Sequence, residues 1–138
     1  MRNALDRTSD ESRAIVNELW VRLRRLGDRR QDRIHRRVGR YWIAIRSVRR
    51  GRVFAELRPH RTRIEVFILP PPRHLRDPHG LARQAPRSQG WGWFRARFHI
   101  DSRGLVPFAF DLIRQSYEDG RPSDGKSVRS QRRNPRRV

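Results

Sequence analysis

The chain has 138 residues, no cysteine, and 34 lysines and arginines against 14 aspartates and glutamates, a formal net charge of +20. The absence of cysteine excludes disulfides, thiol catalysis and cysteine-based zinc sites. No apolar run approaches the roughly 18 residues that a membrane span needs, and the first residues lack the apolar stretch of a secretory signal. We therefore expect a soluble, cytoplasmic protein, with no membrane contact, whose charge favours polyanionic partners.

Arginine supplies almost all of this charge, since Lys126 is the one lysine. A codon bias in a GC-rich genome is an alternative explanation for that ratio, although it explains the excess over acidic residues less well. Chemistry that depends on a lysine ammonium is disfavoured. The charge is densest over residues 41–100, where 13 arginines stand against 3 acidic residues, a net of +10.

Residues 8–26 have the pattern of an amphipathic helix. Apolar side chains recur at helical spacing and polar side chains at the start can cap the helix: Ile15, Leu19, Leu23 and Leu26, preceded by Thr8, Ser9 and Asp10. Gly27 is in a position to end this helix. Residues 28–39 are highly charged. Ile34 and Val38, spaced by four, permit a helical turn there, and a solvated loop is the alternative.

The apolar period changes to two after residue 40, which predicts strands over residues 41–46, 53–58 and 63–69. Gly51, in the first turn, can adopt a positive φ angle. The prolines at 70–72 end the third strand, because proline cannot donate to the sheet. A long connection over residues 73–90, rich in proline, glycine, histidine and arginine, is a candidate functional loop.

A fourth strand is predicted over residues 91–100, followed by a helix that Asp101 or Ser102 can cap and that ends near Glu118. Pro107 falls in its first turn, where proline is tolerated. This order predicts an α+β fold, a four-stranded antiparallel sheet with an N-terminal and a C-terminal helix packed on one face. We assign residues 1–7 to a flexible N-terminus, 8–118 to a single domain and 119–138 to a disordered basic tail.

Alternation along the strands divides their side chains between two faces. The face expected to meet the helices is apolar: Ile43, Ile45, Val53, Ala55, Leu57, Ile64, Val66, Ile68, Phe94, Phe98 and Ile100. The opposite face mixes aromatic rings with arginines: Trp42, Arg46, Phe54, Arg58, Arg63, Phe67, Trp93, Arg95 and Arg97. Such a face can stack bases and neutralise phosphates. The alternatives are a solvated face and a homodimer interface built on tryptophan and arginine.

Catalytic and metal-binding patterns are weak in this sequence. Glu56 and Glu65 lack the lysine of a restriction-type magnesium site, and pairing with arginine across the sheet explains both more simply. His74 and His79, with Asp77 between them, lack a third firm metal ligand. Neither a nucleophile elbow nor a phosphate-binding loop is present. We predict no catalytic residues, no metal and no cofactor.

These patterns predict a non-enzymatic domain that binds DNA or RNA mainly through phosphates. The residues expected to do so are Trp42, Arg46, Arg58, Arg63, Trp93, Arg95 and Arg97 on the sheet face and Arg132 and Arg133 in the tail. A module that binds another protein, or a homodimer without any role in nucleic-acid binding, is the first alternative. Binding of a small anion at residues 73–90 is the second.

Five stretches occur in the order found in one protein family: Tyr41–Ile45, Gly51–Ala55, Asp77–Leu81, Trp91–Gly92 and Leu112–Glu118. Together they resemble the bacterial and archaeal domain of unknown function 5655, sometimes labelled a predicted transport protein. The resemblance covers about residues 10–118. It implies a small α+β domain, found alone or appended to other domains, with no established catalytic residues. One departure is the basic segment 83–89, where the family usually has a short loop of mixed charge.

Overall fold

The computed structural model describes residues 2–86 and 93–119. Its two α-helices are α1 (Asp10–Leu23) and α2 (Val106–Glu118). Its strands are β1 (Ile34–Val38), β2 (Ile43–Ser47), β3 (Arg52–Pro59), β4 (Ile64–Ile68), β5 (Arg83–Gln84) and β6 (Ala96–Ile100). Two short 3-10 helices are η1 (Pro72–His74) and η3 (Arg103–Leu105). Neither described α-helix has the length and apolar character needed to cross a bilayer.

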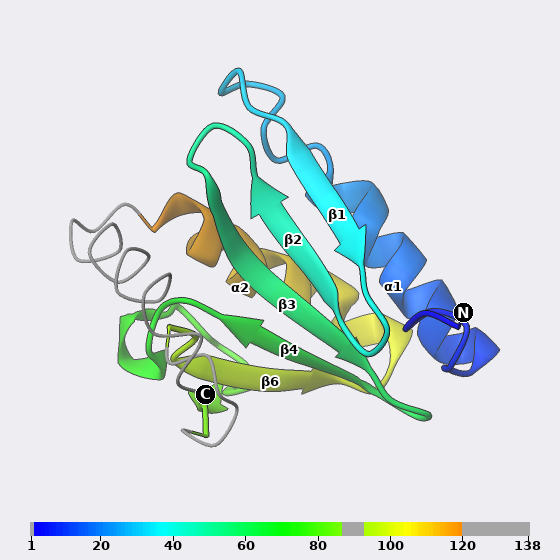
Figure 1. Ribbon diagram of the computed structural model, residues 1–138. Coiled ribbons are helices and arrows are strands. Elements are labelled where there is room, and N and C mark those ends of the chain that lie inside the picture. The colour runs from blue at the N-terminus through cyan, green and yellow to red at the C-terminus, as the bar shows by residue number, and fades with distance from the viewer. Residues whose placement is uncertain (1, 87–92, 120–138) are drawn as a thin grey trace, which may run out of the picture.

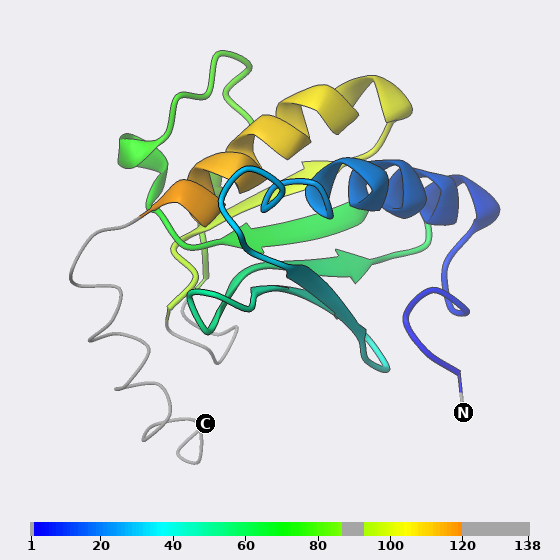
Figure 2. The same ribbon diagram turned by 90° about the horizontal axis from the view of Figure 1, so that it is seen from above.

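All the strands belong to one antiparallel sheet in the order β1-β2-β3-β4-β6-β5 (Figure 1). Seen from above, the sheet is curled, and both helices lie on the same side of it (Figure 2). The predicted α+β class is therefore confirmed. The predicted count of four strands is too low, because β1 and the two-residue β5 extend the sheet at its two edges.

Strand β1 corrects the prediction of a helical turn or loop over residues 28–39. Ile34 and Val38 share the side of β1 that faces the helices, and Arg36 lies between them on that side. The Arg36 guanidinium lies 5.2 Å from the centre of the Trp20 ring of α1, so the arginine covers an aromatic residue where an apolar side chain was expected. A spacing of four residues fits a strand as well as a helix, so the two apolar residues alone did not separate them.

Helix α1 begins after Ser9, whose side chain accepts a 3.1 Å hydrogen bond from the Ser12 amide, as the capping pattern predicts. The helix ends at Leu23, earlier than the predicted 26. Gly27 lies in the turns that follow. A Cβ atom at Gly27 would lie 2.4 Å from the Asp32 carbonyl oxygen, so this position requires glycine because two backbone segments approach closely, and not because a helix ends there.

A bulge in β3 corrects the predicted facing of two residues. Ile45 pairs with Ala55 and Arg46 pairs with Val53, which leaves Phe54 as an extra residue on its strand. Val53 is therefore turned away from the helices. Phe54 is fully buried, and its ring packs edge-on against Tyr117 of α2, 5.1 Å between ring centres.

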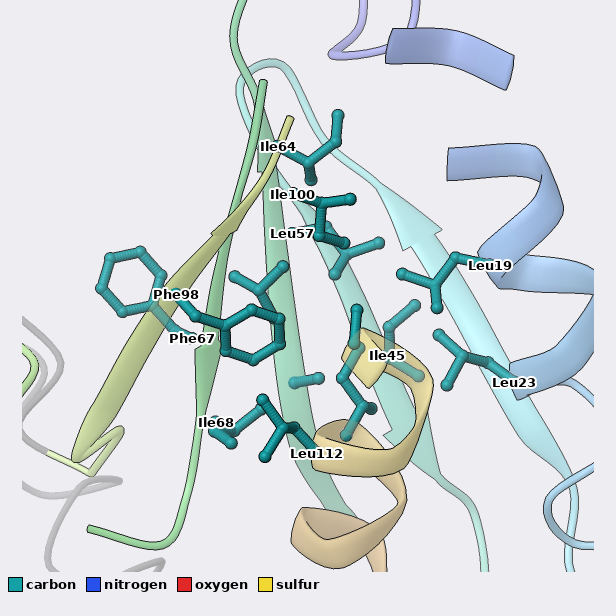
Figure 3. Packing of buried hydrophobic residues seen from close by; sticks show 14 of the residues in the cluster. Leu19, Leu23, Ile45, Leu57, Ile64, Phe67, Ile68, Phe98, Ile100 and Leu112 are labelled. Atoms are coloured by element: carbon teal, nitrogen blue, oxygen red, sulfur yellow. The ribbon is translucent and has the colours of Figure 1, made fainter. Parts of the chain in front are cut away.

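The hydrophobic core lies between the sheet and the two helices (Figure 3). Leu19 and Leu23 of α1 and Leu112 of α2 point toward Ile45 and the other apolar residues of the sheet (Figure 3). Ser116 joins α2 to this layer, because its hydroxyl donates to the Phe54 carbonyl at 2.6 Å and accepts from the Leu69 amide at 3.0 Å. The bulge is therefore held by a buried hydrogen bond as well as by packing.

Two further expectations are wrong at the last strand and helix. Strand β6 begins only at Ala96, so Phe94 precedes the regular alternation. Its ring contacts Phe67, which points away from the helices (Figure 3). Helix α2 is preceded by η3 and has Leu105 at its N-cap, so neither Asp101 nor Ser102 caps it. Pro107 does occupy the first turn of α2.

The residues before α1 make contacts with the sheet. At the N-terminus, Ala4 is buried and its amide donates to the Gly39 carbonyl at 2.9 Å. The boundaries at 7 and 118 and the flexibility of residues 1–7 stay predictions. The predicted basic tail, with Arg132 and Arg133, lies outside the described residues from 120 onward.

Candidate nucleic-acid interface

We call the side of the sheet away from α1 and α2 the open face; Figure 1 looks onto it. Phe67 defines it, because its ring points away from α2 (Figure 3). Glu56 and Arg97 are the cross-strand partners of Phe67 and so share this face. Alternation and register add the other members: His35, Arg37, Ala44, Arg46, Val53, Arg58, Glu65 and His99. Neither described α-helix covers the open face.

The predicted site residues on the described part of the chain gather on or beside this face. Arg46, Arg58 and Arg97 lie within strands β2, β3 and β6. Three more, Trp42, Arg63 and Arg95, are exposed and lie one residue before β2, β4 and β6. Trp93 is half-buried, with its ring 5.8 Å from that of Phe94. The arginines nevertheless differ in their surroundings.

A groove of about 590 Å³ lies at the β1–β2 side of the sheet. Its lining comes from both sides of β1: Trp20, Ile34 and Arg36 belong to the helix side, and His35, Arg37, Ala44, Arg46 and Val53 belong to the open face. We call it the basic groove, because arginine and histidine are its only ionisable lining residues. Arg37 lies opposite Ala44, and Arg46 lies between His35 and Val53, so neither arginine has an acidic cross-strand neighbour. The positive charge of the groove is therefore not balanced by a lining carboxylate.

Exposed aromatic rings lie on the β1–β2 connection. Tyr41 is 51 % exposed and Trp42 is 36 % exposed. The guanidinium groups of Arg7 and Arg40 lie 4.8 Å and 5.4 Å from the centre of the Tyr41 ring. Rings in such surroundings offer stacking surfaces at the same end of the molecule as cationic groups.

Carboxylates hold the arginines that strands β3 and β6 place on the open face. Arg58 Nε donates to Glu56 Oε1 at 2.8 Å, and the Arg58 guanidinium lies 4.9 Å from the Phe67 ring centre. Arg97 donates to Glu65 Oε2 at 3.3 Å. The predicted pairing with arginine across the sheet is confirmed for Glu65 and wrong for Glu56, whose arginine partner lies on the same strand. Arg58 and Arg97 are therefore less available to a phosphate than Arg37 and Arg46.

Glu65 is the centre of a group that we call the Glu65 cluster: Glu65, His60, Arg97 and His99. His60 Nε2 lies 3.1 Å from Oε1 of Glu65, and His99 Nε2 lies 3.9 Å from Oε2. Burial raises the pKa of Glu65, but the hydrogen bond and charge of His60, with Arg97 and His99, outweigh it and hold this pKa below its usual value. Burial, with the charges of Arg63 and Arg97, lowers the pKa of His99, and Glu65 opposes this shift.

Ion pairs balance the charge on the helix side of the molecule. Arg103 bonds Glu18 of α1 at 3.0 Å. Arg114 bonds Glu118 at 3.0 Å and also bonds Asp111, and Arg30 reaches Glu118 at 2.9 Å. This arrangement leaves the open face as the more basic side among the described residues.

The loop after β4 is held by hydrogen bonds to its own backbone. Asp77 accepts from the amides of Leu81 at 3.0 Å and Ala82 at 2.7 Å, and the His79 ring lies 3.8 Å from that of Phe108. The part of the chain that the structure describes has no group of three or more histidines and acids arranged to hold a metal ion. Nearby is a pocket of about 350 Å³, lined by Pro70, His74, Arg76, Gln115, Glu118 and Asp119. Its two acids weaken the alternative of a small-anion site.

Sequence reasoning missed His35, Arg36 and Arg37, because residues 28–39 were assigned to a turn or loop. A period of two from Ile34 to Val38 was the signal that could have found them. No protein-family model, no curated protein and no solved structure matches this chain. The resemblance to domain of unknown function 5655 stays a prediction, and function has to be inferred from the geometry.

Proposed function

We propose that this protein binds single-stranded nucleic acid along the open face, mainly through the phosphates. The basic groove carries the proposal. Arg37 and Arg46 are exposed there, His35 lies beside them, and no carboxylate lines the groove. Guanidinium groups bind phosphate oxygens through paired hydrogen bonds, and such contacts dominate the affinity of proteins for nucleic acids.

Aromatic residues favour single strands over duplexes. Tyr41 and Trp42 are exposed on the connection between the two strands that line the groove. Unpaired bases can stack on such rings, whereas bases within a duplex are already stacked. In this arrangement the arginines bind the backbone and the rings bind the bases, with little discrimination between sequences.

A salt titration tests the proposal. Fluorescence anisotropy would measure the affinity of the full chain for labelled single-stranded and double-stranded DNA and RNA between low and physiological salt. We expect affinity tighter than micromolar at low salt, a steep loss with salt, and a preference for single strands. Affinity that is weak at low salt, or insensitive to salt, would contradict the proposal.

Two double variants locate the interface. R37Q/R46Q removes two arginines from the basic groove, and R22Q/R24Q removes two exposed arginines at the C-terminal end of α1. Both change the net charge equally. Because each phosphate contact on a single strand contributes about 0.7 to the log–log salt slope, R37Q/R46Q should lower the slope by about 1.4 and R22Q/R24Q should leave it nearly unchanged. Equal changes would show that net charge alone drives binding.

Sedimentation at several concentrations separates this function from the homodimer alternative. The proposal requires the open face to be accessible, so the free protein should sediment as a monomer at concentrations where it binds nucleic acid. A tight dimer that protects Trp42 from quenching would contradict an open binding face.

A further inference from the structure

The Glu65 cluster contains more groups than an ion pair needs. Arg97 alone would neutralise Glu65, yet one histidine lies within 3.1 Å of one carboxylate oxygen and a second lies 3.9 Å from the other. The members come from separate segments: His60 follows β3, Glu65 is on β4, and Arg97 and His99 are on β6. The fold thus brings two imidazoles, one carboxylate and one guanidinium to a single point on the open face.

The cluster is reachable by a ligand from the open face. The side chains of His60, His99 and Arg97 are 48 %, 35 % and 32 % exposed, whereas that of Glu65 is 13 % exposed. The carboxylate therefore lies behind the three cationic or titratable groups. A phosphodiester that approaches from solvent would meet the imidazoles and the guanidinium before the carboxylate, and the exposed Arg63 adds positive charge nearby.

We propose that the Glu65 cluster cleaves RNA by transesterification, without a metal ion. In this reaction the 2′ oxygen of one nucleotide displaces the 5′ oxygen of the next nucleotide from the phosphorus atom between them. The proposal rests on the proposed function, because the same open face has to hold the strand. It adds a substrate class, RNA, and a reaction that binding alone does not imply.

The step balances in protons and bonds. Neutral His99 accepts the proton of the 2′-hydroxyl, and the 2′ oxygen attacks phosphorus to form a new P–O bond. The bond from phosphorus to the 5′ oxygen breaks, and protonated His60 gives its Nδ1 proton to that leaving oxygen, because its Nε2 faces Glu65. The products are a 2′,3′-cyclic phosphate and a 5′-hydroxyl. Proton exchange with water then restores both imidazoles.

The surroundings of the two histidines indicate that His99 accepts the proton and that His60 donates one. Burial and the arginines at 63 and 97 lower the pKa of His99, which keeps it neutral and able to accept a proton near neutral pH, and His60 adds to this shift while Glu65 opposes it. His60 Nε2 contacts the carboxylate directly, which orients the ring. Arg97 uses Nη1 for its hydrogen bond to Glu65, and its other N–H groups stabilise the charge that develops on the phosphoryl oxygens. Glu65 is a positioning residue, since it bonds His60, lies 3.9 Å from His99 and does not touch the substrate.

The predicted absence of catalytic residues rested on incomplete metal-binding patterns and on the lack of a nucleophile elbow and a phosphate-binding loop, and this reaction needs none of these. His60 and His99 are far apart in the sequence, and the pairing of β4 with β6 brings them to the same carboxylate. DNA lacks the 2′-hydroxyl, so it should bind on the open face without being cut.

The experiment uses a labelled single-stranded oligonucleotide of DNA that contains one ribonucleotide, with an all-DNA oligonucleotide of the same sequence, both in excess EDTA. We expect the wild-type chain to bind both and to cleave only the first, at the ribose, leaving a 2′,3′-cyclic phosphate and a 5′-hydroxyl. H99N and H60N should each lower the cleavage rate by about 10²-fold or more. Because both histidines are partly exposed, these variants should keep the wild-type unfolding transition.

A matched control is H79N, which makes the same change at an exposed histidine in the loop after β4. It should cleave at the wild-type rate, and equal cleavage by all the variants would show a contaminating nuclease and overturn the proposal. E65Q should lower the rate and shift the pH profile, as expected when a group acts through the imidazoles. Binding without any cleavage would overturn the cleavage proposal and leave the binding function intact, whereas the absence of binding would overturn both.

Discussion

The two halves of the open face both carry arginines, but the neighbours of those arginines differ. In the β1–β2 half, Arg37 lies opposite Ala44 and Arg46 lies opposite Val53. In the β3–β4–β6 half, Arg58 bonds Glu56, and Arg97 shares Glu65 with two histidines. The identity of the cross-strand neighbours, and not the number of arginines, therefore decides which guanidinium groups can bind an external phosphate.

This difference suits one half of the open face to binding and the other half to chemistry. Unpaired arginine charge attracts a polyanion and binds it with little geometric demand. A carboxylate that holds arginine and histidine side chains in place lowers the net attraction but fixes donor and acceptor groups at defined positions, which chemistry requires.

The largest contrast is in folding stability, between two aromatic residues of the open face. Phe67 is 2 % exposed, whereas Trp42 is 36 % exposed. F67A should lower the free energy of unfolding by about 3–5 kcal/mol, because it leaves a cavity, and W42A should lower it by less than about 1 kcal/mol. Denaturant unfolding measures both. Similar losses would mean that the β3–β4–β6 half is not the more tightly packed one.

The next contrast is in affinity, between one arginine from each half. R46Q should weaken binding of single-stranded nucleic acid about fivefold, which corresponds to roughly 1 kcal/mol for one charge-assisted contact. R58Q should change it less than about twofold, because Glu56 already holds that guanidinium. Fluorescence anisotropy at one low salt concentration measures both affinities. A greater loss for R58Q would reverse the assignment of the binding half.

A gain in affinity is expected when an acid of the β3–β4–β6 half is removed. E56Q releases Arg58 from its 2.8 Å hydrogen bond and adds one positive charge to the open face. Affinity should rise about threefold at low salt, and the gain should disappear as salt screens the surface. An unchanged affinity would mean that nucleic acid does not reach this half.

The smallest effect concerns protonation of His99. Its folded-state pKa lies below the usual 6.5, so the neutral form is favoured and its contribution to stability is lost as pH falls through 6.5 toward that lower value. NMR titration of the imidazole should show the pKa falling further in E65Q, which removes the opposing charge, and rising in R97Q. Shifts in the opposite directions would contradict the described cluster.

Much of the fold follows from patterns visible in the sequence. The spacing of Ile15, Leu19 and Leu23 predicts α1, and alternation predicts the four central strands. Strand β1 could not be predicted in this way, because Arg36 takes an inward position that an apolar residue usually fills. The bulge at Phe54 also left no local signal, since it depends on a partner strand and on the Ser116 hydroxyl of α2.

The sequence predicted which face of the sheet carries the candidate site, but it did not predict the basic groove. Arg46 and Trp42 were predicted and lie at the β1–β2 side. Arg37 was missed with its strand. Pairing of Glu65 with an arginine across the sheet was predicted, but its identity as Arg97 and the convergence of two histidines on the same carboxylate depend on the register of β4 with β6, which the sequence alone does not give.

The most direct test of the binding function is the map of NMR chemical shifts on the isotope-labelled full chain, titrated with a single-stranded oligonucleotide at low salt. We expect the largest chemical-shift changes at Arg37, at Arg46 and at the Trp42 indole. Changes around Glu65 should be smaller, and the outer side of α2 should show nearly none. Changes confined to the helices, or none at saturating oligonucleotide, would contradict the claim that the open face binds nucleic acid.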